Sequence, residues 1–320
     1  MKKVVVIGGG TGTFTVLTGI KDKPYEISVI VSMMDSGGST GRLRDQFGVL
    51  PPGDIRQCLV ALSEASDLWR KLFLYRFENG DFSGHNFGNI FLTALEKIAP
   101  DYQKVIDHAS YILQTKGDVI PVTFDKVQLC ATYENGETLE SEELIDTASH
   151  NSSKITKAYL KPQASANRNA LLAIEEADFI IIGPGDVYTS LISNLLVTGV
   201  KEAIMKSPAK IINIMNLMTK SGQTTNFKAS DHCHDLEEYL GRKIDFVVVN
   251  TAPIKSDVLE HYEKHNEKPV IDDLPHDETI IRMELADEVR YNTSKADKHR
   301  RSILRHDPKL VADAIAAVIN

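Results

Sequence analysis

Glycine and threonine residues gather directly after the first apolar run of the chain. Val4–Ile7 is followed by GGGTGT over residues 8–13. Glycines let the chain turn sharply and bring backbone N–H groups close to a phosphate, and the start of the following helix adds its dipole. We therefore expect this segment to hold the phosphates of a nucleotide-type ligand. The candidate binding residues are Gly9, Gly10, Thr11, Gly12 and Thr13.

This loop does not match the dinucleotide fingerprint G-x-G-x-x-G. Thr13 occupies the third glycine position when the motif is read from Gly8, and Thr15 occupies it when the motif is read from Gly10. No Gly-Lys-Ser/Thr follows, so the loop is not a P-loop either. A tight strand–helix turn without a ligand is the alternative interpretation.

A second cluster follows the next apolar run, Ile27–Val31, with the sequence DSGGSTGRLR over residues 35–44. An acid at the end of a second strand can accept hydrogen bonds from ribose hydroxyls, hold a divalent metal or act as a base. Glycines, serines and arginines are suited to phosphate. A solvated, flexible loop is the alternative. The candidates are Asp35, Ser36, Gly37, Gly38, Arg42 and Arg44.

Further candidates lie later in the chain. Asp54 either caps the helix that begins near it or joins the site, so Asp35 and Asp54 are both candidate catalytic acids. His85 and Asn89 are four residues apart and can share one helical face. The run IIIGPGDVYTS over residues 180–190 repeats the order of buried strand, glycine turn and helix. The remaining candidate binding residues are Gly183, Pro184, Gly185, Asp186, Tyr188, Thr189, Asn216 and Thr219.

The elements that must position these residues alternate between strands and helices. Apolar runs indicate buried strands at Val4–Ile7, Ile27–Val31, Phe179–Ile182, Ile211–Met215 and Phe246–Val249, and apolar spacings of three and four indicate helices at Arg56–Ala65, Asn89–Ile98 and His232–Leu240. This order predicts an α/β fold, a Rossmann-like, doubly wound and mostly parallel sheet.

The middle of the chain differs from this pattern. Residues 119–123 and 127–133 are β-like, and the turn signal ENGE at 134–137 predicts a hairpin that extends the sheet or forms a small lobe. Ile155–Leu160 is a further candidate strand. We expect one domain over 1–320 with a small insertion near 115–165. Residues 266–300 are polar and should be rich in loops, and 306–319 should form a closing helix capped by Asp307.

Composition excludes several classes of protein. The 320 residues carry a net charge of -8, which argues against nucleic-acid binding. Three widely spaced cysteines, Cys58, Cys130 and Cys233, predict neither a disulfide framework nor a zinc site. The apolar run near residue 4 is too short for a signal peptide, and no run approaches the roughly 18 residues of a membrane span. We expect a cytoplasmic protein without a membrane span.

Taken together, the motifs resemble the gluconeogenesis-factor family (YvcK-like), within the superfamily of 2-phospho-L-lactate transferase (CofD). The matching stretches occur in family order over nearly the whole chain: IGGGTGT, DSGGSTGRLR, LPPGDIRQCLVAL, GHNFGNIFLTAL, IGPGDVYTSLISNLLVTG, NLMTKSGQT and RHDPKLVADAI. The resemblance implies a Rossmann-like fold with a ligand crevice at the strand ends. It also implies binding of a UDP-sugar such as UDP-N-acetylglucosamine, and links to carbon metabolism, cell shape and cell-wall precursor allocation.

Three functions follow as hypotheses. The first is a nucleotide-sugar-binding regulatory protein without turnover, which could form a homo-oligomer and would need no metal. The second is a transferase moving a phospholactyl-type group from a nucleoside-diphosphate donor, with magnesium on Asp35 or Asp54. Many relatives carry two adjacent acids where this chain has Asp35-Ser36, and the transferase branch usually has GPSNP where this chain has GPGDV, which favours the first. The third is an NAD-binding oxidoreductase, which the broken fingerprint disfavours.

Overall fold

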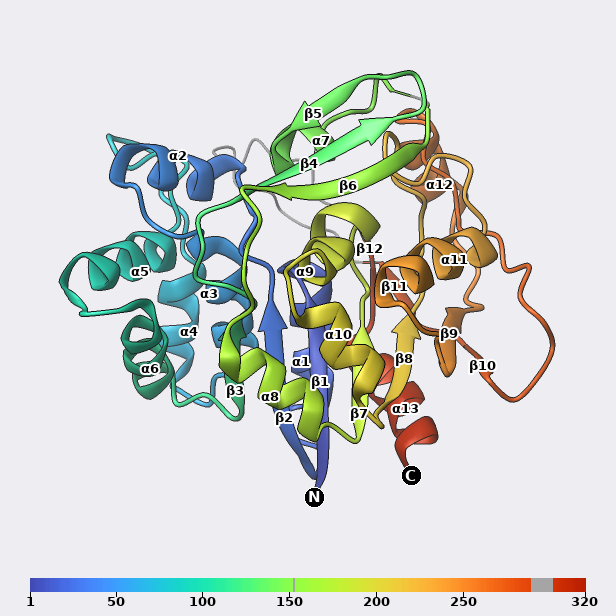
Figure 1. The fold of residues 1–320 in the computed structure, drawn as a ribbon, viewed down its shortest axis with the longest axis horizontal. Helices are drawn as coiled ribbons and strands as arrows, with labels where there is room; N and C mark the ends of the chain where they lie inside the picture. Colours follow the sequence, from blue (N-terminus) through green and yellow to red (C-terminus); the bar gives the residue numbers. More distant parts are fainter. Residues whose placement is uncertain (152, 289–301) are drawn as a thin grey trace.

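The computed structural model describes residues 1–151, 153–288 and 302–320. Its centre is a seven-stranded sheet in which all neighbouring strands are parallel (Figure 1). The strands, in chain order, are β1 (Lys2–Gly8), β2 (Tyr25–Val31), β3 (Asp118–Pro121), β7 (Phe179–Ile182), β8 (Lys210–Ile214), β9 (Phe246–Asn250) and β10 (Ile280–Met283). Val and Ile fill the central strands and are buried, as expected for a sheet covered on both faces. The predicted doubly wound α/β fold is confirmed.

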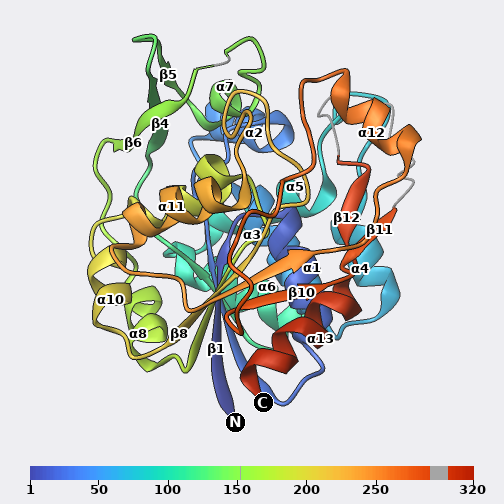
Figure 2. The ribbon, with the colours of Figure 1, turned by 90° about the vertical axis from the view of Figure 1, so that its right-hand side faces the viewer.

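Helices cover both faces of this sheet (Figure 2). One face carries α1 (Thr11–Ile20), α3 (Pro52–Ala61) and α13 (Pro308–Ile319), and the other carries α8 (Arg168–Glu176), α10 (Val200–Lys206) and α11 (Ala229–Leu240). Further helices are α2 (Gly38–Phe47), α4 (Asp67–Leu74), α5 (Phe87–Ile98), α6 (Tyr102–Leu113), α7 (Glu142–Asp146), α9 (Ser193–Leu195), α12 (Ser256–Glu263) and the π-helix η1 (Val187–Ile192).

The strand order determines where a ligand can lie. The sheet runs β10-β9-β8-β7-β1-β2-β3, so the chain builds outward from β1 in one direction through β2 and β3 and in the other through β7 to β10. A crevice forms beyond the carboxyl ends of the strands where this direction reverses, and ligands of open α/β sheets bind there. In this protein the reversal lies between β1 and β7.

A second, antiparallel sheet forms a lobe over residues 128–161. Its strands are β4 (Gln128–Tyr133), β5 (Thr138–Glu140) and β6 (Ile155–Lys161), and the predicted hairpin turn joins β4 to β5. Residues 119–123, which we grouped with this hairpin, instead supply β3 of the main sheet. Among the hydrogen bonds that tie the lobe to the main sheet's loops and helices, Tyr133 Oη donates to the Gly222 carbonyl (3.0 Å), and the Ala158 N–H donates to Tyr239 Oη (3.0 Å).

Several element boundaries differ from the predictions, whereas the cap of the closing helix agrees. The helix expected at 56–65 begins at Pro52 and ends at Ala61, because proline is well suited to a first helical position. Residues 266–300 contain β10 and β11 (Ala286–Glu288), whose pairing with distant strands has no strong local signal, and residues 289–300 lie outside the described residues. The closing helix α13 is capped by Asp307 as predicted, since its carboxylate accepts from Lys309 and Leu310.

Among the described helices, none combines the length and the apolar character needed to cross a lipid bilayer.

Candidate functional site

A cavity of about 350 Å³ opens at the carboxyl ends of the parallel strands, where β1 and β7 diverge. Its walls come from the β1–α1 loop, the segment from β2 to α3, the loops after β7 and β8, the lobe helix α7, and β12 (Leu304–His306). The predicted residues that line it are Gly10, Thr11, Gly12, Asp35, Gly37, Asp54, Asn89, Pro184, Gly185, Asp186, Thr189, Asn216 and Thr219. The three glycine-containing loops chosen from the sequence therefore meet at one site.

The glycine loop allows close packing at the centre of this site. A side chain at Gly12 would collide with the Pro184 carbonyl oxygen, and one at Gly10 would collide with the side chains of Asp54 and Gln57. Packing against backbone thus requires glycine at position 12 with or without a ligand, whereas at position 10 the two side chains would have to move. Gly10 is the N-cap of α1, so the first-turn N–H groups of that helix, which have no partner within a helix, lie at the cavity wall. This arrangement suits an anion.

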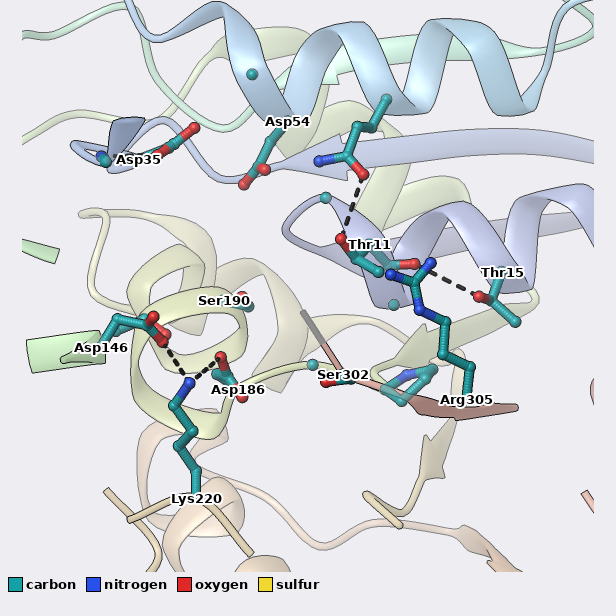
Figure 3. Close-up of a pocket in the computed structure, with 18 of the residues that line it drawn as sticks. Thr11, Thr15, Asp35, Asp54, Asp146, Asp186, Ser190, Lys220, Ser302 and Arg305 are labelled. Atoms are coloured by element: carbon teal, nitrogen blue, oxygen red, sulfur yellow. Dashed lines mark hydrogen bonds and ion pairs between the residues drawn. The ribbon is translucent and has the colours of Figure 1, made fainter. Parts of the chain in front are cut away.

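Carboxylates gather on one side of the cavity (Figure 3). Asp35 accepts from the Gly37 N–H through Oδ1 (3.0 Å), and Glu142 of the lobe accepts from the Ser36 N–H through Oε2 (3.2 Å). Asp54 lies in the first turn of α3 and makes no capping bond, so the capping interpretation of Asp54 is wrong. Burial, followed by the charge of Asp35, raises the pKa of Asp54 and of Glu142 well above the usual range.

Replacing Asp54 with asparagine should therefore stabilise the ligand-free protein at high pH. A raised pKa in the folded state means that the folded protein binds this proton more tightly than the unfolded chain does. Stability is then lost as pH rises above the unfolded value of 3.8. We expect Asp54→Asn to raise the unfolding temperature by about 2 °C at pH 8, which is about 1 kcal/mol, and by less at pH 4.

Calorimetry at the two pH values measures this difference. Asp45→Asn is the matched control, since Asp45 lies in the neighbouring helix α2 with its side chain exposed. A variant at Asp54 that is less stable than the wild type at pH 8 would show that the carboxylate is held favourably in its charged form.

Within the described part of the chain, four cationic side chains also line the cavity: Arg56, Arg76, Lys220 and Arg305. Arg56 is buried, and its guanidinium is oriented by Asn89, whose Oδ1 accepts from Nε (2.8 Å). Arg76 donates to the Gly84 carbonyl (2.7 Å). Lys220 Nζ lies 3.0 Å from Asp146 Oδ1 and 3.8 Å from Asp186 Oδ2, and so joins the lobe to the loop after β7 (Figure 3).

The Lys220 cluster has an unusual charge balance. Burial raises the pKa of Asp186 to about 6, although the ammonium of Lys220 acts in the opposite direction. Burial alone would lower the pKa of Lys220, but the carboxylates of Asp186 and Asp146 hold it above its usual value. The lysine is therefore charged at neutral pH, and one carboxyl beside it titrates in the mildly acidic range.

The other predicted residues do not line the cavity in the described structure: Gly9, Thr13, Ser36, Gly38, Arg42, Arg44, His85, Gly183 and Tyr188. Arg42 donates to the Ser83 carbonyl (3.1 Å), and Arg44 donates to the Asp35 carbonyl (2.7 Å), so Arg44 supports the backbone of Asp35. The Tyr188 hydroxyl donates to Asp235 (2.5 Å). The sequence shows that these three side chains are charged or polar, but it does not show which way they point.

His85 and Asn89 do not share a helical face, because α5 begins at Phe87 after the N-cap residue Asn86. They meet instead at Ser39: His85 Nδ1 lies 3.1 Å from Ser39 Oγ, and the Asn89 amide donates to the same oxygen (3.3 Å). Asn89 lines the cavity and His85 lies behind it. Burial, with Arg42 and Arg76 nearby, lowers the pKa of His85, which favours its neutral form.

Beyond β7 and β8, paired contacts shape the wall. Asn216 forms two hydrogen bonds with the main chain of Gly185, accepting from its N–H (3.2 Å) and donating to its carbonyl (2.9 Å). Thr219 Oγ1 accepts from the Lys268 N–H (2.9 Å). Both predicted side chains therefore hold neighbouring loops in place at the cavity edge.

Several lining residues did not follow from the sequence reasoning. They come from the lobe, from α12 and its following loop, and from β12: Glu142, Glu143, Asp146, Tyr262, Glu267, Ser302, Leu304, Arg305 and His306. Other lining residues, such as Gln57, Ser190 and Lys220, belong to the sequence motifs given above but are not among the candidate binding residues. For Ser190 and Lys220, the neighbouring candidate residue in the sequence could have indicated a place at the site.

Metal binding receives no geometric support within the described ranges. The charge of Asp35 acts on both Asp54 and Glu142. In these ranges, however, no group of three or more His, Cys, Asp or Glu residues is arranged to hold a metal ion.

The chain is similar to known proteins over most of its length. A family model described as 2-phospho-L-lactate transferase CofD matches residues 4–289. The gluconeogenesis factor of Bacillus subtilis is 35% identical over 320 residues, covering 99% of this chain and 98% of that protein. A gluconeogenesis factor from Halalkalibacterium halodurans is 42% identical over 275 residues, covering 85% and 84%. The crystal structure of a UPF0052-family protein from Bacillus halodurans superposes with a TM-score of 0.88 at 37% identity, covering 98% and 99%.

Proposed function

The chain belongs to the 2-phospho-L-lactate transferase CofD family, and we propose that it is a nucleotide-sugar-binding regulatory protein. Its relatives from Bacillus subtilis and Halalkalibacterium halodurans are named gluconeogenesis factors. The observation that carries the proposal is the cavity at the switch between β1 and β7, with the first turn of α1 at its wall. Its ligand is a UDP-sugar such as UDP-N-acetylglucosamine, and its role connects gluconeogenic growth with cell shape and wall-precursor allocation in the cytoplasm.

The charges around the cavity suggest how such a ligand lies. Of the side chains that the structure describes, seven carboxyl groups line it (Asp35, Asp54, Glu142, Glu143, Asp146, Asp186 and Glu267) against four cations. A diphosphate is repelled by carboxylates, so it belongs at the first turn of α1, near the arginines. Carboxylates accept hydrogen bonds well from hydroxyls, so ribose and sugar hydroxyls belong beside them. Asp35, at the end of β2, takes the ribose position of doubly wound folds.

Calorimetric titration with uridine diphosphate sugars tests this proposal. The wild type should bind at least one of them, and Asp35→Asn should weaken binding about tenfold, because two hydrogen bonds to a charged acceptor become weaker. Asp45→Asn, with an exposed side chain in α2, should bind like the wild type. Binding of another nucleotide and of no uridine diphosphate sugar would refute the proposal, and mass spectrometry of ligand released from the purified protein checks it independently.

A transferase is the second candidate function, and one observation favours it. Asp54 lines the cavity, and burial raises its pKa; a carboxyl group that keeps its proton to higher pH is better able to donate that proton to a leaving group. Incubation with nucleoside-diphosphate donors and candidate acceptors, with and without magnesium, tests for a product. A product formed at the wild-type rate by Asp35→Asn would remove Asp35 from that reaction.

A further inference from the structure

His306 is the last residue of β12 and lines the cavity, although its side chain is only 6% exposed. Its ring makes a hydrogen bond to the main chain of Met215, the residue directly after β8. Within the described residues, Nε2 has no hydrogen-bond partner, so the bonded ring atom is Nδ1. A buried polar atom without a partner is costly and rare in folded proteins. The structure therefore leaves one acceptor at the cavity wall to be satisfied by something else.

The protonation state of this ring is well defined. Burial lowers the pKa of His306 to about 4, so the imidazole is neutral at physiological pH. The bond from the ring to the Met215 carbonyl holds the proton on Nδ1, and Nε2 then carries a lone pair and no hydrogen. Such an atom accepts a hydrogen bond and cannot donate one.

The chemistry of Nε2 restricts what can lie against it. Phosphate oxygens at neutral pH are acceptors, so a diphosphate gains nothing from this atom. The parts of a nucleotide sugar that carry donors are the N–H of the base, the ribose hydroxyls, and the hydroxyl and amide groups of the sugar. The partner of His306 is therefore one of these groups.

The sheet topology decides among them. In doubly wound folds the nucleoside lies on the β2 side of the switch point, the diphosphate lies at the loop after β1, and the second half of the ligand lies across the switch. Asp35 marks the β2 side here, whereas His306 is bonded to the end of β8, on the opposite side of β1. Figure 3 shows the neighbouring residue Arg305 on the far side of Thr11 from Asp35. The sugar is the part of the ligand that reaches this side.

We propose that Nε2 of His306 accepts a hydrogen bond from a hydroxyl or amide group of the sugar, and that His306 thereby distinguishes a nucleoside diphosphate sugar from the bare nucleoside diphosphate. This inference rests on the proposed function. To the proposed function it adds one contacting residue and the orientation of the ligand, whose nucleoside lies toward β2 and whose sugar lies toward β8.

Two variants at this position separate the nitrogens of the ring. The amide of asparagine can replace Nδ1 and keep the bond to Met215 while removing the acceptor, and the longer glutamine can place its oxygen near the position of Nε2. We expect His306→Asn to bind UDP-N-acetylglucosamine about tenfold more weakly than the wild type and to bind uridine diphosphate within twofold of it. His306→Gln should retain most of the affinity for the sugar nucleotide.

Calorimetric titration with both ligands gives these ratios, and nitrogen NMR of the folded wild type supplies a readout that needs no variant. The Nε2 resonance of His306 should shift on adding UDP-N-acetylglucosamine and stay in place on adding uridine diphosphate. Equal weakening of both ligands in His306→Asn, unchanged binding of both, or an Nε2 resonance that ignores the sugar would each overturn the inference while leaving the proposed function standing. Failure of the wild type to bind either ligand would overturn both.

Discussion

Gly12→Ala is expected to lower the free energy of unfolding by about 3 kcal/mol and to weaken ligand binding at least tenfold. The added methyl group would collide with the Pro184 carbonyl oxygen, which is backbone and cannot rotate away. Relief requires the β1–α1 loop and the loop after β7 to move apart. These two loops form the opposite sides of the switch point, so the same movement widens the cavity and misplaces the first turn of α1.

Alanine is the better helix former, which makes this prediction demanding. Without the collision, Gly12→Ala in α1 should stabilise the protein by up to about 1 kcal/mol. Urea unfolding and calorimetric titration measure the two effects. Thr11→Ala is the control: it changes the neighbouring residue and loses only the hydroxyl bond to Gln57 Oε1 (3.3 Å), so its stability should fall by about 1 kcal/mol or less. A Gly12→Ala protein as stable as the wild type would contradict the close approach of the two loops.

The parts of the site that could be predicted are those that directly follow a strand. Gly10, Asp35 and Gly185 come after apolar runs that are easily recognised as buried strands, and parallel strands bring their carboxyl ends to one edge. The lining role of these residues followed from chain order alone. Side-chain direction did not: Arg42 and Arg44 were chosen for their charge, but the winding of α2 turns them toward Ser83 and toward the backbone of Asp35.

The parts that could not be predicted depend on packing between distant segments. Glu142 and Asp146 reach the cavity because the lobe folds back over the main sheet, and no local pattern near them specifies that contact. From the sequence, His306 is only the residue that precedes the N-cap of the closing helix. It becomes a cavity residue because β12 pairs with β11 and its ring bonds to Met215, which is 91 positions earlier by residue number.

Lys220→Met is expected to destabilise the protein by about 3 kcal/mol at pH 8. Its ammonium group is the cation between Asp146 of the lobe and Asp186 of the main sheet's loop, and methionine fills a similar volume without the charge. Removing the cation leaves two neighbouring, partly buried carboxylates whose charges repel each other. The carboxylates, rather than the lost attraction by itself, account for most of the expected loss.

The pH dependence of this loss has a definite sign. At pH 4 Asp186 is protonated, so the repulsion between the two carboxylates is absent and the variant should be closer in stability to the wild type. The difference should grow as pH rises through the pKa of Asp186, about 6, and be complete by pH 8. Thermal unfolding from pH 4 to pH 8 measures it. Lys206→Met, which changes an exposed lysine of α10, should show no such trend.

The same variant tests whether the lobe is held to the main sheet through charge. Lys220 is one of several ties, since Tyr133 and Ala158 also bond across to Gly222 and Tyr239. Limited proteolysis should therefore cut Lys220→Met faster within residues 128–161 while the main sheet stays resistant. Adding Asp146→Asn should recover part of the lost stability, because it removes one of the two repelling charges. If the double variant is no more stable than Lys220→Met, repulsion between the carboxylates is not the cause, and the lysine stabilises the lobe through packing of its side chain.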